Sequence, residues 1–306
     1  MGEFLQYVIN GLALGAIYSL VALGLVVIYR GTGHLNFAQG EMALFATFGA
    51  WWIYDRGVTM WFAVIIATVF AFIGGAVIEF GLMRPAGKKS PLAVVVVSIA
   101  LFQGMNSLTN LVFKESSDGV TFQSLFPNEP LDFYRLSGET IWRFQDLGIL
   151  VTVLILTGGL FLLFQKTKVG LAMRMVANNP DSAKLVGVST NKTLMLSWGI
   201  AAALGAVAGA MIGGLNANLN IFTMFEIFLL SSAAATLGGL DSPLGALVGG
   251  LLLGVIKSLV SNYPKDWAGS GYVNATTAVA AAFVIILIVL VVRPSGLFGS
   301  SRVERV

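Results

Sequence analysis

Three polar side chains, Asn36, Gln39 and Glu41, lie close together in a short segment between two long apolar runs. Gly31, Gly33 and Gly40 lie in or just before this segment, and glycine permits the irregular backbone that interrupts a helix. Polar side chains in apolar surroundings are costly, so these three should face protein or a water-filled path. Two interpretations stay open: they line a translocation path, or they bond to a broken helix and its neighbours.

Glu226 and Lys257 are a second pair of ionisable residues in apolar surroundings. Counted from the ends of their apolar segments, they lie at similar depths in two neighbouring antiparallel helices. We therefore expect an ion pair between them, with a structural role favoured over a gating role because the pair lies near one surface. Glu79 lies near the end of another apolar segment, from which it can reach the interface.

The sequence offers little for metal binding or catalysis. His34 is the only histidine, and the chain has no cysteine. We expect His34 to be a hydrogen-bonded side chain, and we expect no metal site and no disulfide. A membrane-embedded enzyme would need a cluster such as paired acids with several histidines, which this sequence lacks.

The composition is that of a membrane protein. Apolar residues make up 57% of the 306 positions and charged residues only 11%, which excludes an ordinary soluble domain and a disordered chain. The 36 glycines fit a bundle in which small residues let helices approach closely. The expected fold class is an all-α, polytopic transmembrane helix bundle that forms a single domain over residues 1–306.

A helix needs about 20 mostly apolar residues to cross a bilayer, which gives about 8–10 helical segments in this chain. Residues 37–54 follow the glycine-containing segment, so this helix is expected to be broken or re-entrant. A second glycine-rich stretch, 238–245, suggests an internal repeat. The assigned segments are about 7–28, 37–54, 60–82, 91–113, 146–164, 193–215, 223–240, 244–260 and 275–292.

The distribution of charge predicts the orientation, because loops rich in Lys and Arg stay in the cytoplasm. In the connection of about 114–146, acidic residues outnumber basic ones, so it is expected to be periplasmic. The N-terminus is then periplasmic and the C-terminus cytoplasmic. The basic residues assigned to the cytoplasmic side are Arg30, Arg84, Lys88, Lys89, Lys166, Lys168, Arg174, Lys184, Lys192, Arg293, Arg302 and Arg305.

The segment 167–193, TKVGLAMRMVANNPDSAKLVGVSTNKT, is the main candidate for a cytoplasmic contact surface. A helix is expected over 169–177, and a second over 182–186 with Gly187 as the residue that ends it. Short helices that project from a bundle suit docking into a groove of a soluble partner. The alternative is an ordinary basic loop on the membrane surface.

Within this segment, RMVANNPDSAKLVGV (174–188) resembles the coupling loop by which bacterial ABC importer permeases engage their ATPases. GHLNFAQGE (33–41), LGGLDSPLGALVGG (237–250) and RPSGLFG (293–299) resemble motifs of branched-chain amino acid permeases, in the same order. The chain is similar to the shorter of the two paired permeases of that family. The resemblance assigns ATPase coupling to Arg174, Ala177, Asn178, Asn179, Pro180, Asp181, Ala183, Gly187 and Val188.

The resemblance also implies partners in a bacterial inner membrane: a second homologous permease, two cytoplasmic ATPases and a periplasmic solute-binding protein. The sequence contains no GxxxxGK[ST] phosphate loop, so energy must come from another subunit or from an ion gradient. We expect no catalytic residue and no cofactor bound by this chain, with ATP and Mg used by the partner ATPases.

The expected function is import of amino acids, with leucine, isoleucine and valine favoured by the family resemblance alone. Permeases for urea, amides or other amino acids remain alternatives. An ion-coupled secondary transporter is the alternative from another class, but such a protein typically carries acids deep in its bundle, and here Glu41 is the only candidate.

Overall fold

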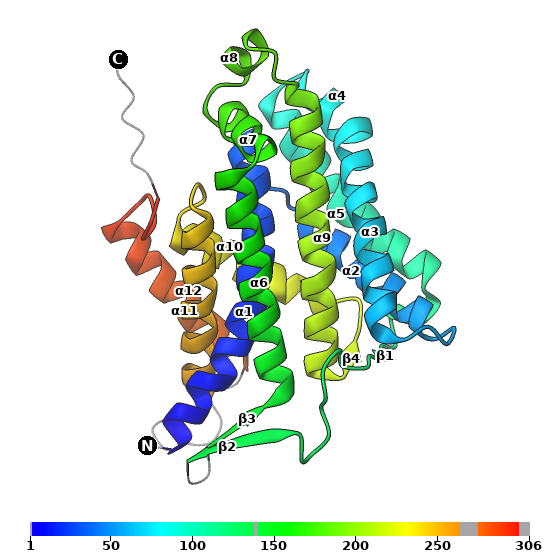
Figure 1. The fold of residues 1–306 in the computed structure, drawn as a ribbon, viewed down its shortest axis with the longest axis vertical. Coiled ribbons are helices and arrows are strands. Elements are labelled where there is room, and N and C mark those ends of the chain that lie inside the picture. The colour runs from blue at the N-terminus through cyan, green and yellow to red at the C-terminus, as the bar shows by residue number, and fades with distance from the viewer. Residues whose placement is uncertain (1, 138–139, 263–274, 300–306) are drawn as a thin grey trace.

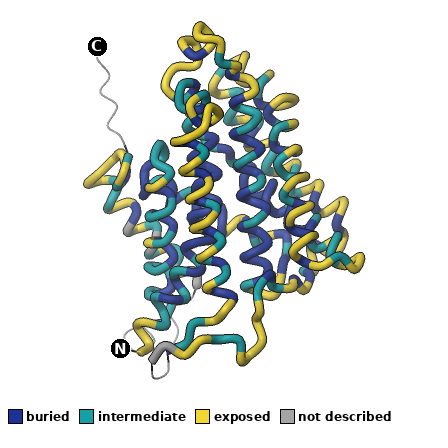
Figure 2. Tube along the Cα trace, in the orientation of Figure 1, coloured by how far each residue is buried: buried dark blue, intermediate teal, exposed yellow. Residues whose placement is uncertain are grey.

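Two long helices occupy the centre of the bundle, α1 (Gly2–Thr32) and α9 (Thr190–Asn216) (Figure 1). The computed structural model describes residues 2–137, 140–262 and 275–299. Helix α1 is apolar on all sides and buried through most of its length, which suits the centre of a membrane bundle (Figure 2). It packs against α11 (Pro243–Asn262), α9, α10 (Thr223–Gly238) and α6 (Phe144–Lys166).

The remaining helices surround this centre. Helix α2 packs between α9, α3 and α5, while α12 lies against α11 and α10. The bounds are α2 (Gln39–Tyr54), α3 (Met60–Ile78), the π-helix η1 (Glu79–Met83), α4 (Arg84–Gly87), α5 (Pro91–Val112), the short 3-10 turn η2 (Lys114–Ser116), α7 (Lys168–Asn178), α8 (Pro180–Leu185) and α12 (Ala275–Val292).

Each of the nine predicted segments coincides with a helix of the described residues. Six helices are long and apolar enough to cross a membrane, and α10 and part of α12 are shorter apolar helices. Helix α2 has 16 residues and is about 24 Å long. It is therefore shorter than the hydrocarbon core of about 30 Å. This length agrees with the expectation that the helix at 37–54 is broken or re-entrant.

The helices α1, α2 and α3 form one half of the bundle, and α9, α10 and α11 form a second half with matching contacts. The corresponding helices of the two halves run in opposite directions. Helix α3 packs on α9 as α11 packs on α1, and α2 packs on α9 as α10 packs on α1. Helix α1 ends at the end of the bundle where α9 begins (Figure 1). This is the arrangement of an inverted repeat. The counterpart of the break at 33–38 is the loop 217–222 between α9 and α10, so the expected match with 238–245 is wrong.

Four short strands lie at one end of the bundle, which we call the strand end (Figure 1). Strand β1 (Val120–Thr121) pairs with β4 (Asn218–Leu219), and β2 (Phe133–Ser137) forms a hairpin with β3 (Thr140–Arg143). The β1–β4 pair ties the connection between α5 and α6 to the loop after α9. The sequence predicted none of these strands.

The opposite end, which we call the loop end, carries α4, α7 and α8 (Figure 1). Helix α7 packs on α6, α1 and α9 there. Arg84, Lys88 and Lys184 therefore gather at one end of the molecule, as the charge pattern predicts. Arg302 and Arg305 lie outside the described residues.

Candidate functional site

The segment before α2 is held by its own side chains. The Oδ1 of Asn36 accepts a hydrogen bond from the Ala38 amide at 3.0 Å, and its Nδ2 donates to Oε1 of Gln39 at 3.3 Å. The Nε2 of Gln39 donates to the Ala201 carbonyl on α9 at 2.7 Å. Both side chains are buried. These bonds favour the interpretation that Asn36 and Gln39 hold the broken helix and its neighbours, rather than line a translocation path.

Glu41 joins α2 to α5. It is 1% exposed, and its Oε2 accepts a hydrogen bond from Nδ2 of Asn106 at 2.9 Å. An ionisable group at this depth is expected to have a polar partner, and here a neutral amide supplies it. The bond fixes α5, which otherwise contacts the bundle sparingly, against α2.

Helix α5 exposes polar side chains where other outer helices expose apolar ones. Gln103, Ser107 and Asn110 recur at i, i+4 and i+7 and are exposed on one side of α5. The exposed positions of α3 are all apolar, as a lipid-facing helix requires: Trp61, Phe62, Ile65, Ile66, Val69, Phe70, Ile73 and Val77. We call Gln103, Ser107 and Asn110 the α5 polar stripe. The stripe was not predicted from the sequence, although its spacing is visible there.

An apolar cavity of about 340 Å³ lies beside this stripe, between α5, α10 and the segment before α2. The rings of Phe102 on α5 and Phe225 on α10 lie 6.0 Å apart at its edge. Phe37, Ile99, Phe228 and Leu229 also line it. We call this cavity and the α5 polar stripe together the α5–α10 wall.

Glu226 and Lys257 lie next to this wall and form the expected contact. The Nζ of Lys257 is 2.5 Å from Oε1 of Glu226 and donates to the Tyr18 hydroxyl at 3.2 Å. The Lys257 side chain is 14% exposed and that of Glu226 is 52% exposed. The pair therefore connects α10, α11 and α1, and the Glu226 carboxylate is the more exposed partner.

The predicted pair of helices at 167–193 is present at the loop end. Thr167 caps α7 by accepting from the Gly170 amide, and Oδ1 of Asn179 caps α8 by accepting from the amides of Asp181 and Ser182. Gly187 has a φ of +84°, the left-handed conformation that ends α8. The observed helices, α7 and α8, start one or two residues earlier than expected.

The residues assigned to coupling divide into outward and inward groups. Ala183 is buried, and Arg174 donates to Oε1 of Gln165 at 3.1 Å, which holds α7 on the end of α6. Asn178, Asn179, Pro180, Asp181 and Gly187 are exposed, while Ala177 and Val188 are half-buried. The apolar Leu185 is 88% exposed beside them, so α8 presents an apolar tip that none of the described residues covers.

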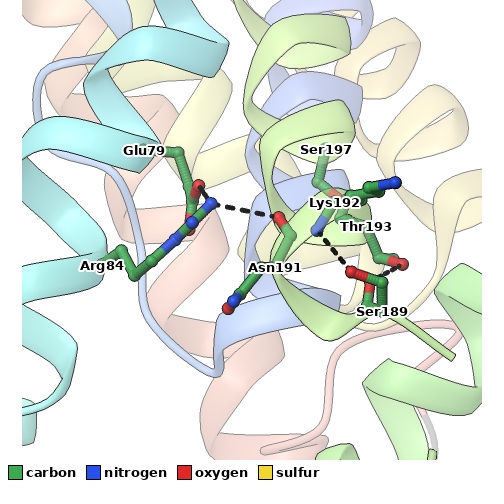
Figure 3. A network of polar contacts seen from close by, with 7 residues as sticks. All are labelled: Glu79, Arg84, Ser189, Asn191, Lys192, Thr193 and Ser197. Atoms are coloured by element: carbon green, nitrogen blue, oxygen red, sulfur yellow. Dashed lines mark hydrogen bonds and ion pairs between the residues drawn. The ribbon is translucent and has the colours of Figure 1, made fainter. Parts of the chain in front are cut away.

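A polar network ties the loop to the membrane helices (Figure 3). The Nη2 of Arg84 lies 2.7 Å from Oε2 of Glu79 and donates to the Asn191 carbonyl at 3.4 Å. Glu79 is buried in this pair at the loop end of the bundle, and its reach to the membrane interface stays a prediction. Ser189 caps α9 by accepting from the Lys192 amide at 3.5 Å. Among the described residues, no group of three or more His, Cys, Asp or Glu could hold a metal ion.

Two expected motifs contact each other at the loop end. The amides of Leu297 and Phe298 donate to the carbonyls of Leu237 and Gly238 at 2.8 and 3.0 Å. The segment 293–299 is therefore packed on the end of α10, next to the loop that leads to α11.

These features define a class of protein: a polytopic membrane protein with one polar wall among apolar outer helices and a helical loop outside the bundle. A family model described as "branched-chain amino acid transport system, permease component" matches residues 7–292. The chain belongs to this family. It is therefore a multi-pass inner-membrane permease of the ABC transporter class.

Individual relatives agree with the family. The chain is 29% identical over 313 residues to the high-affinity branched-chain amino acid permease LivH of Escherichia coli, covering 99% of this chain and 98% of that protein. It is 30% identical over 316 residues to BraD of Pseudomonas aeruginosa, with the same coverage. The nucleoside permease NupB of Lactococcus lactis is 24% identical over 291 residues, which are 89% of this chain and 77% of NupB.

Proposed function

We propose that this permease forms one side of the path by which an ATP-driven importer moves amino acids with apolar side chains. Leucine, isoleucine and valine are the favoured substrates. The α5–α10 wall is the observation that supports the proposal. Exposed amide and hydroxyl groups are costly against lipid, so α5 must face water or protein there. A second, homologous permease that covers this wall would enclose a polar path between the two chains.

The chemistry of the wall suits an amino acid with an apolar side chain. Phe102, Phe225 and their neighbours offer an apolar surface to the side chain, while Gln103 and Ser107 of the α5 polar stripe offer hydrogen bonds to the ammonium and carboxylate groups. The Oδ1 of Asn110 already accepts hydrogen bonds from the hydroxyls of Ser116 and Ser117. LivH and BraD are named for branched-chain amino acids. Urea, amides, other amino acids and nucleosides remain alternatives, since NupB belongs among the relatives.

The segment 167–193 is the proposed coupling loop. Its exposed apolar tip at Leu185 suits docking in a groove of a cytoplasmic ATPase, and its ties to α6 and α9 would pass movement to the membrane helices. In this orientation the loop end is cytoplasmic and the strand end periplasmic, with 114–146 facing a solute-binding protein. ATP and Mg would be bound by the ATPases, because this sequence contains no GxxxxGK[ST] phosphate loop.

Uptake into proteoliposomes tests the proposal. We expect leucine uptake when the chain is reconstituted with its partner permease, ATPases and binding protein, and only with ATP present. Uptake that follows a proton or sodium gradient without ATP would instead support the ion-coupled alternative.

Neighbouring substitutions on α5 test the path. Ser107→Phe places a ring in the proposed path and should abolish most uptake, whereas Leu108→Phe, on the other flank of α5, should leave uptake near the original level. Equal uptake by the two variants would place the path elsewhere.

A further inference from the structure

A second cavity, of about 380 Å³, lies at the loop end; it shares the lining residue Leu35 with the cavity of the α5–α10 wall. It is enclosed by the end of α1, η1 and α4, the start of α5, α8 and the start of α9. The Glu79–Arg84–Asn191 network forms part of its lining (Figure 3). We call it the loop-end cavity.

The lining of the loop-end cavity is basic. Arg84, Lys88 and Lys184 line it, and Glu79 is the only acidic residue among its lining residues. Glu79 is already paired with Arg84, and Lys184 is paired with Asp181 at the surface. Lys88 takes part in none of the ion pairs of the described residues, so its charge is available to a ligand.

The polar side chains of the lining can also donate hydrogen bonds. His34, Thr190 and Asn191 line the cavity, and their imidazole, hydroxyl and amide groups carry donors. A ligand rich in oxygen acceptors and negative charge would match these donors and the basic side chains.

Polarity changes with depth along the cavity. Helix α1 runs toward the loop end, so Ile28 lies one turn deeper than Thr32. Helices α5 and α9 start at this end, which places Val94 about one turn and Trp198 about two turns inside the bundle. The basic side chains belong to α4, the residue after it and α8, at the outer end. Apolar side chains lie within, as an amphiphilic ligand requires.

We propose that the loop-end cavity binds the phosphate headgroup of an anionic phospholipid, with part of an acyl chain along its apolar inner end. Basic cavities between membrane helices at a cytoplasmic surface are suited to such headgroups. Lys184 belongs to α8, whereas Lys88 and Arg84 belong to the membrane-helix side. A bound headgroup would therefore join the segment 167–193 to the helices that move with it. A soluble phosphate compound shares the headgroup chemistry but not the need for the apolar end.

Lipid retention by the purified full chain tests the proposal. Native mass spectrometry and thermal unfolding in detergent are compared after addition of phosphatidylglycerol, phosphatidylcholine with the same acyl chains, inorganic phosphate, or leucine. We expect retention and stabilisation with phosphatidylglycerol only. Stabilisation by inorganic phosphate without lipid retention would assign the cavity to a soluble phosphate compound, and stabilisation by leucine would assign it to cargo. Equal retention of both lipids would also overturn the proposal.

Two adjacent lysines supply a matched control. Both lysines are exposed, but only Lys88 lines the cavity. Lys88→Ala should weaken phosphatidylglycerol binding about fivefold, the effect of one lysine near an anionic headgroup, while Lys89→Ala should not. Equal binding by Lys88→Ala and Lys89→Ala would contradict the proposal. These readouts need no transport, so they are independent of the proposed cargo.

Discussion

Single residues divide into those that hold the bundle and those that face out of it. Asn36 and Gln39 bond to the broken backbone and to α9, while Gln103 and Ser107 point away from the bundle. Polarity alone did not separate these roles, because both sets are amide or hydroxyl side chains in apolar segments. Burial separates them, and burial depends on how helices distant in sequence pack together.

The Glu226–Lys257 pair gives a prediction at this scale. Glu226→Gln leaves the largely buried Lys257 without its counter-charge and should lower stability by about 1 kcal/mol, a modest loss because the carboxylate is half exposed. The exchanged pair, Glu226→Lys with Lys257→Glu, should recover much of that loss. Thermal unfolding in detergent measures both.

Uptake by the same variants separates a structural role from gating. If the pair is structural, the exchanged variant transports normally once it is stably inserted. Normal stability with abolished uptake would show that the pair acts in gating.

Among the elements, helices were predictable and their irregularities were not. All nine assigned segments are helices because long apolar runs carry a strong signal. The internal repeat was predicted from the glycine-rich stretch 238–245, whereas the true counterpart of the break at 33–38 is the loop 217–222. That loop contains no glycine, so no glycine pattern marked it, and it turns at Ala217, which has a φ of +52°. The two-residue strands β1 and β4 could not be predicted from the sequence. They pair across almost one hundred positions, and no local pattern specifies such a pairing.

The contact between α1 and α11 gives a prediction about packing. A Cβ added to Gly15 would lie 2.7 Å from the Gly250 carbonyl oxygen, whereas one added to Gly158 on α6 meets nothing within 4 Å. Gly15→Ala should cost about 1–3 kcal/mol through overpacking. Gly158→Ala changes helix propensity by the same amount and should not lower the unfolding temperature. Similar unfolding temperatures would show that α1 and α11 are not closely packed.

The tip of α8 gives a prediction about coupling. Leu185 is 88% exposed at the loop end and Leu131 is 84% exposed near the strand end. Leu185→Asp should reduce ATP-driven uptake severalfold and weaken co-purification of the ATPases, because it places a charge in the proposed docking surface. Leu131→Asp introduces the same change far from that surface and should leave ATPase binding unchanged. Loss of ATPase binding in both variants would point to a general defect rather than to docking.

At the scale of the whole molecule, the fold separates three surfaces. Apolar outer helices such as α3 face lipid, the loop end carries a cluster of basic residues, and the α5–α10 wall is the polar exception. Composition and charge were sufficient to predict the first two. The third required the structure, because only the packing of α5 showed which of its sides was left uncovered.

The central claim is that α5 borders a water-filled path in the assembled transporter, and one labelling measurement tests it most directly. The chain has no cysteine, so single cysteines can be introduced without background. Gln103 and Val69 are both exposed near the middle of their helices, on α5 and α3. A water-soluble maleimide should label Gln103→Cys and leave Val69→Cys unlabelled, because a thiolate forms and reacts in water rather than in lipid. Equal labelling of the two, or labelling of Val69→Cys alone, would contradict the assignment of the α5–α10 wall to the path.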